Sequence, residues 1–111
     1  MMRTMSLAAA AVLLAAPAAA QDQPDAAQAE SRLRTCLLTG SSAATGASLE
    51  AKVIQARAFC GAQINRVRDQ RVAAATQGLS GDDARKAADR AIRALNREIA
   101  VAVSNFTGLA E

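Results

Sequence analysis

Apolar residues recur at three- and four-residue spacing along most of the chain, and this spacing constrains the fold more than any other feature of the sequence. The clearest run lies between residues 48 and 77, where the apolar positions fall on one face of a helix. No segment alternates apolar and polar residues as a half-buried strand does. The sequence therefore predicts an all-α protein with a long helix over residues 48–77. The apolar stripe of this helix is Leu49, Val53, Ala56, Cys60, Ile64, Val67 and Ala74.

A shorter helix is predicted before the long one, over residues 25–38. Pro24 opposes the continuation of a helix from the preceding residues, and Gly40 favours a helix end. The small side chains of residues 41–47 then indicate a loop that leads to Ser48, a good residue for a helix N-cap.

A third helix is predicted over residues 80–106. It opens with Ser80 and Asp83, which resemble a capping box with Asp in place of Glu. The short connection over residues 78–81 predicts that the second and third helices are antiparallel neighbours, with the first helix packed across the pair. The predicted fold is thus a three-helix arrangement with a long hairpin. The apolar stripe of the third helix is Ala88, Ile92, Leu95, Ile99, Ala102 and Phe106.

The N-terminus has the layout of a cleavable export signal. Arg3 precedes an unbroken apolar stretch over residues 7–16, and small residues 18–20 follow Pro17. The stretch is shorter than the roughly twenty residues that span a bilayer. We therefore predict a signal peptide over residues 1–20 and cleavage near Ala20. The mature chain, residues 21–111, would form a single small helical domain with a loose leader over 21–25 and a frayed tail over 107–111.

The predicted address of the mature chain is the periplasm or the extracellular space. No cysteine follows the predicted cleavage site directly, so a lipid anchor is not indicated, and no later segment is apolar enough to span a membrane. The preference for arginine over lysine and the many alanines favour a bacterial source.

The residue types that the chain lacks argue against most kinds of catalysis. The sequence contains no His, Trp or Tyr, which excludes Ser-His and Cys-His nucleophilic pairs and every histidine metal site. It also has no glycine-rich phosphate loop, and its two phenylalanines are no stacking platform for bases. We therefore predict a protein that is not an enzyme, with no cofactor, no metal and no nucleic-acid partner.

Two cysteines lie on the apolar stripes of consecutive predicted helices. Export would place Cys36 and Cys60 in an oxidising compartment, so we predict a disulfide between them. A redox-active pair is the alternative, but catalytic pairs usually occupy a C-x-x-C turn at a helix start. A disulfide would also support a core that is thin because alanine buries little apolar area. The larger residues of this predicted core are Leu33, Leu37, Leu49, Val53, Ile64, Ile92, Leu95 and Ile99.

Four basic residues recur on the third predicted helix, opposite its apolar stripe. Lys86, Arg90, Arg93 and Arg97, which we call the basic ridge, are spaced to share one outer face. One interpretation is attraction to an anionic surface such as lipid headgroups or lipopolysaccharide. The other is an ordinary solvated face, in which carboxylates four residues earlier pair with Lys86 and Arg93.

The segment over residues 32–67 resembles a recurring type of small, uncharacterised exported bacterial protein. The resemblance is carried by the signal peptide, the Cys36-Leu37 pair near a helix end, and the second cysteine in an alanine-rich helix. It implies a small exported helical protein and no particular activity. The periplasmic helical chaperones linked to envelope stress differ, because their Leu-Thr-x-x-Gln repeats are absent here.

The predicted function is that of a non-catalytic interaction or structural module of the cell envelope with an unknown partner. Ile54 and Val72 lie off the apolar stripe of the long helix, where they could contact that partner, while Arg71 interrupts the stripe. The alternative function is binding of anionic envelope components through the basic ridge. The sequence leaves the oligomeric state open.

Overall fold

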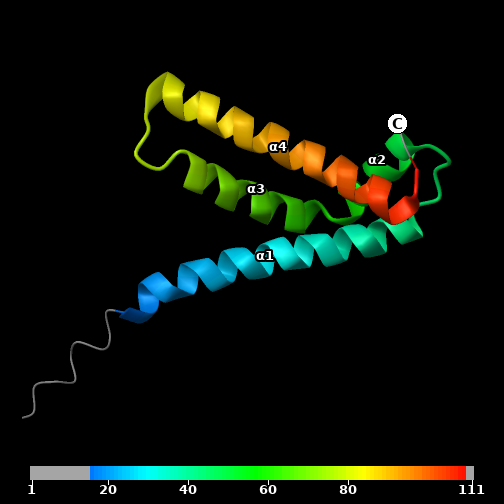
Figure 1. Cartoon of the computed structure of the whole chain (residues 1–111), viewed down its shortest axis with the longest axis horizontal. Helices are drawn as coiled ribbons and strands as arrows, with labels where there is room; N and C mark the ends of the chain where they lie inside the picture. Colours follow the sequence, from blue (N-terminus) through cyan, green and yellow to red (C-terminus); the bar gives the residue numbers. More distant parts are fainter. Residues whose placement is uncertain (1–15, 110–111) are drawn as a thin grey trace, which may run out of the picture.

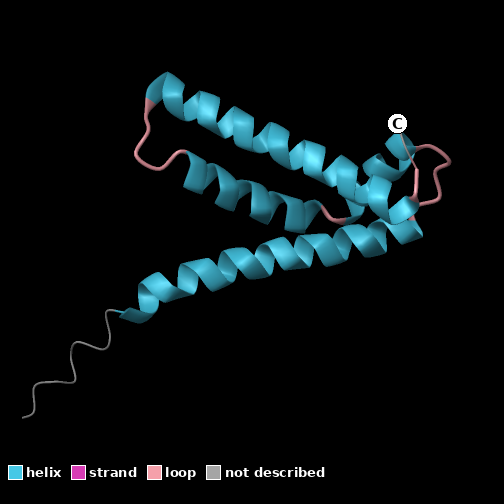
Figure 2. Cartoon of the chain, viewed as in Figure 1, coloured by secondary structure: helices cyan, strands magenta, loops and turns pink. Residues whose placement is uncertain are grey.

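Four helices make up the part of the chain that the computed structural model describes, which is residues 16–109. No strand occurs among these residues, so the predicted all-α class is confirmed. Figure 1 shows the antiparallel hairpin formed by the last two helices, and Figure 2 shows the short loops between elements. The first helix packs against all three others. The helices are α1 (Ala16–Ala43), α2 (Leu49–Phe59), α3 (Gly61–Ala75) and α4 (Gly81–Thr107).

The predicted single helix over residues 48–77 is wrong, because it divides at Cys60. This residue has φ −106° and ψ 21°, outside the helical range, and Figure 1 shows that α2 and α3 point in different directions. Helical backbone hydrogen bonds are present on either side of the break. Cys60 N donates to Ala56 O and Ile64 N donates to Cys60 O, both at 2.9 Å. The break is thus one residue long. Gly61, a poor helix former, and the covalent bond at Cys60 both favour it at this position.

The predicted end of the first helix at Gly40 is also wrong, since α1 continues to Ala43. Gly40 is buried against α2, where an added Cβ would lie 3.2 Å from Phe59 Cδ1 and 3.5 Å from Ala56 Cα. The missing side chain lets the two helices approach closely, so this glycine serves packing. Near the end of α1, the Ser42 hydroxyl donates to Leu38 O at 2.9 Å, so this side chain bonds to the backbone of its own helix.

The start of α1 also differs from the prediction. The helix passes through Pro24, which has no N–H to bond the carbonyl of Ala20, and one missing bond does not end a helix formed on both sides. Residues 21–25, predicted as a loose leader, are helical. Most of the predicted signal peptide lies outside the described residues, and its predicted cleavage site near Ala20 falls within α1.

The loop over residues 44–48 is fastened to α2 by side chains from that helix. Gln55 Oε1 accepts from Thr45 N at 2.8 Å, and Lys52 Nζ donates to Ala44 O at 2.8 Å. A Cβ on Gly46 would lie 2.4 Å from Ala51 Cβ, so this position requires glycine. Ser48 is the N-cap of α2, as predicted, and its side chain accepts a hydrogen bond from Ala51 N. At α4, Ser80 occupies the N-cap position, but its side chain makes no capping bond.

The core lies where α1, α2, α3 and the second half of α4 meet. Six of the eight larger predicted core residues are buried, while Val53 and Ile92 are half-buried. On α4 the stripe is displaced at its end, because Val103 is 0% exposed and Phe106 is 39% exposed. Beyond the left-handed Gly108, Leu109 packs against the core. The buried cluster consists of Ala29, Leu33, Leu37, Leu49, Ala56, Cys60, Ile64, Val67, Leu95, Ile99 and Val103.

The predicted disulfide is confirmed. Cys36 of α1 and Cys60 at the α2–α3 break are bonded, with Cα atoms 5.8 Å apart. Cys60 is fully buried and Cys36 is half-buried, so the bond lies at the edge of the core. It fixes α1 to the point at which the chain changes direction.

None of the helices in the described part of the chain is both long and apolar enough to cross a membrane.

Candidate functional site

The basic ridge lies on the outer face of α4 as predicted. Lys86, Arg90, Arg93 and Arg97 are all exposed, and none forms a salt bridge with another residue that the structure describes. Neither of the two pairings with a carboxylate four residues earlier forms a salt bridge, and Asp82 pairs with Arg85 rather than with Lys86. The four cations are therefore accessible to an external anion.

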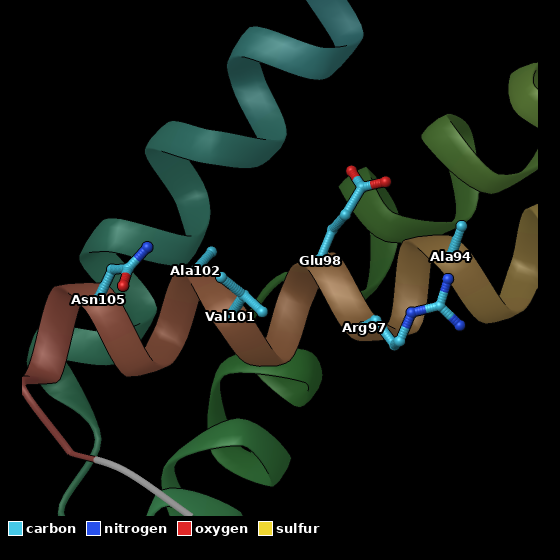
Figure 3. Close-up of a pocket in the computed structure, with 6 residues that line it drawn as sticks. All are labelled: Ala94, Arg97, Glu98, Val101, Ala102 and Asn105. Carbon is cyan, nitrogen blue, oxygen red and sulfur yellow. The ribbon is translucent and has the colours of Figure 1, made fainter.

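A shallow depression runs along α4 beside the end of the ridge. Figure 3 shows that its six lining residues all come from this helix, with Arg97 and Glu98 pointing in opposite directions. Its centre is the apolar pair Val101 and Ala102, and Asn105 lies at the far end. Val101 is 58% exposed. The depression is too open to enclose a small molecule.

Arg71, which interrupts the apolar stripe in the sequence, connects three helices. Its Nε and Nη2 donate to the two carboxylate oxygens of Glu30 on α1 at 2.9 and 2.8 Å. Its Nη1 and Nη2 donate to those of Glu98 on α4 at 2.9 and 2.8 Å. The hydrogen bond from Arg71 holds the pKa of Glu30 below its ordinary value, against the opposing effect of burial. The same bonds raise the pKa of Arg71, so its charge is permanent.

The ion pairs of Arg71 with Glu30 and Glu98 predict that the fold loses stability at low pH. Because the pKa of Glu30 is lowered by folding, its carboxylate stabilises the fold above the unfolded pKa, and this contribution disappears as pH falls through the folded pKa. Glu30→Gln should lower the free energy of unfolding by about 1 kcal/mol at pH 7 and much less at pH 3. Urea unfolding at the two pH values measures the difference. Glu50→Gln, at an exposed position, is the control, and equal acid dependence in both variants would contradict the prediction.

Most of the large exposed apolar residues belong to segments that meet at one end of the molecule. Figure 1 shows the end of α1, the short α2 and the end of α4 meeting there, opposite the α3–α4 turn. Five of the six large exposed apolar residues belong to these segments, and the sixth, Leu79, lies in the turn. We call this region the apolar end. Its members are Leu38, Ile54, Phe59, Val101 and Phe106.

The two partner-contact residues suggested by the sequence behave differently. Ile54 is 60% exposed and belongs to the apolar end. Val72 is half-buried on α3, so the structure does not bring the two together as one exposed patch. The exposure of Phe59 and Phe106 was not predicted, and Phe106 was placed on the apolar stripe of the third helix.

No known protein family, curated protein or solved structure matches this chain. Within the part of the chain that the structure describes, no group of three His, Cys, Asp or Glu side chains is placed to hold a metal ion.

Proposed function

We propose that this protein is a non-catalytic interaction module of the bacterial cell envelope, which binds a partner protein through its apolar end. The observation that carries the proposal is the exposure of both phenylalanines, Phe59 at 57% and Phe106 at 39%. Burying one such side chain contributes about 1.5–3 kcal/mol. A domain with an alanine-rich core would gain from burying both, yet the fold leaves them at the surface.

The envelope location rests on two sequence features. The layout of residues 1–20 is that of an export signal, and a structural disulfide is typical of proteins in oxidising compartments. Both features support a mature protein that acts in the periplasm or outside the cell.

The proposal predicts capture of a partner that depends on the apolar end. Ile54→Ala combined with Phe59→Ala should reduce retention of the partner from an envelope extract about tenfold or more, because central apolar anchors dominate protein interfaces. Leu79→Ala removes an equally large exposed side chain at the opposite end and should leave retention unchanged. Mass spectrometry of the retained proteins measures the effect. Equal retention by both variants would reject the apolar end as the binding surface.

A second candidate function is binding of anionic envelope components through the basic ridge. All four ridge cations are exposed, which favours this second function. None of them is neutralised by a salt bridge within the described residues, so their positive potentials add. In the same experiments, salt-sensitive binding to lipopolysaccharide that is lost on joint Arg90, Arg93 and Arg97→Ala substitution would point to this function. Partner capture that survives the substitution would point to the apolar end.

A further inference from the structure

The cleft between α1 and α3 brings together two arginines. Arg32 of α1 and Arg66 of α3 both line two adjoining hollows, one shared with Ala62 and Gln63 and the other with Gln70. Neither guanidinium forms a salt bridge with any carboxylate in the described part of the chain. Two cations that line one cleft repel each other, and an anion between them would replace this repulsion with attraction.

The carboxylates around this α1–α3 cleft do not neutralise it. Glu30, the neighbour of α1 residues in the cleft, has both oxygens bonded to Arg71. Asp25 lines the second hollow together with Arg32 and Arg66 but forms no ion pair with either. The side chains that line the second hollow thus carry two positive charges and one negative charge.

The cleft also contains an unsatisfied hydrogen-bond acceptor. Gln70 Oε1 is buried and has no hydrogen-bond partner among the residues described. A buried acceptor without a donor is costly, and such groups in native proteins call for an explanation. Gln70 lines the same hollow as the two arginines, with the amide of Gln28 nearby in the lining. Rotation of the Gln70 amide toward the hollow would let a ligand hydroxyl beside the anion supply the missing donor.

We propose that the α1–α3 cleft binds a phosphate monoester carried by a hydroxylated molecule, such as a phosphorylated sugar. The phosphate lies between Arg32 and Arg66, whose planar guanidinium groups each offer paired donors to phosphate oxygens. A phosphate monoester carries about −1.5 to −2 charges near pH 7, which matches two guanidinium groups. The short side chains of Ala29 and Ala62 leave room for it, and the Gln70 amide, once rotated into the hollow, accepts a hydrogen bond from a ligand hydroxyl.

This inference is independent of the proposed partner binding, because no residue of the apolar end or the basic ridge lines the cleft. Failure of one leaves the other standing.

Isothermal titration of the purified, oxidised full chain with glucose 6-phosphate, inorganic phosphate and glucose tests the proposal. Glucose 6-phosphate should bind more tightly than inorganic phosphate, and glucose should not bind measurably. Arg32→Gln and Arg66→Gln should each weaken binding of glucose 6-phosphate about tenfold or more, the usual effect of losing a charge-assisted hydrogen bond. Arg93→Gln makes the same charge change on α4 and should alter binding less than about twofold.

Two further substitutions separate the parts of the site. Asp25→Asn removes the one carboxylate in the lining and should tighten binding of both anions. Gln70→Leu should reduce the preference for glucose 6-phosphate over inorganic phosphate, and an unchanged preference would overturn the role of its oxygen. Circular dichroism and thermal unfolding of each variant confirm that the fold is retained.

Vesicles that contain phosphatidic acid distinguish a lipid-borne phosphate from a soluble one. Vesicle binding that Arg66→Gln abolishes, with no binding of glucose 6-phosphate, would assign the same site to a lipid phosphate. Binding of any of these probes that Arg93→Gln weakens as much as Arg66→Gln would overturn the proposal, as would the absence of binding to all of them at millimolar concentration.

Discussion

Replacing Cys36 and Cys60 together by alanine is expected to lower the free energy of unfolding by about 3 kcal/mol. The disulfide closes a loop with a sequence separation of 24, and a closed loop of this size removes chain entropy from the unfolded state on this scale. The effect is large for a small domain, whose total stability often lies between about 5 and 15 kcal/mol. We choose alanine rather than serine because Cys60 is fully buried, and a serine at that position would bury a new hydroxyl group.

Urea unfolding, monitored by circular dichroism with and without reductant, measures this loss. The reduced natural chain and the double alanine variant should have matching midpoints, both well below that of the oxidised chain. The variant itself should not respond to reductant. An oxidised chain with the same midpoint as the variant would show that the crosslink contributes no stability.

Ile99→Ala is expected to lower the free energy of unfolding by about 3 kcal/mol. Ile99 is 1% exposed at the centre of the buried cluster, so its truncation removes buried apolar area and leaves a cavity. The neighbouring core is built from alanine, valine and leucine held on rigid helices, which cannot collapse fully into the space. Urea unfolding under oxidising conditions measures the change.

Ile54→Ala is the matched control for this cavity, because it makes the same substitution at a side chain that is 60% exposed. A change within about 0.5 kcal/mol is expected for it. Equal losses for the two variants would mean that Ile99 does not lie in the core.

The sequence was sufficient to predict the helical class, the disulfide and most of the core. These properties depend on the period of the apolar residues and on the pairing of the only two cysteines, both of which can be seen in a single chain. Ser48 was recognised as an N-cap for the same reason, because capping is a local interaction.

The sequence was not sufficient where tertiary contacts override local preference. Gly40 is a common helix terminator, but here its missing side chain admits α2, and nothing in the local sequence shows that contact. The break at Cys60 depends on the disulfide to a distant residue as much as on Gly61. Pro24 was given too much weight, since it removes one hydrogen bond from α1 without ending it.

Of the candidate surfaces, the basic ridge was predicted because its residues share one helix. The α1–α3 cleft joins Arg32 to Arg66, residues from two helices, so the spacing within either helix does not reveal it. In the sequence, Arg71 was the one residue that indicated a contact between helices. A charged residue within an apolar stripe implies a partner, and here the partners are Glu30 and Glu98 on two other helices.

The break at Cys60 also bears on the order in which the chain folds. The α3–α4 hairpin joins segments that follow each other directly, whereas α1 contacts α4 across most of the chain. Contacts between near neighbours cost less chain entropy and generally form sooner. We therefore expect the hairpin to assemble first and α1 to dock last. Because Cys60 lies where the hairpin begins, docking of α1 holds the Cys36 thiol beside it, and the disulfide then ties the last helix to dock to the unit that forms first.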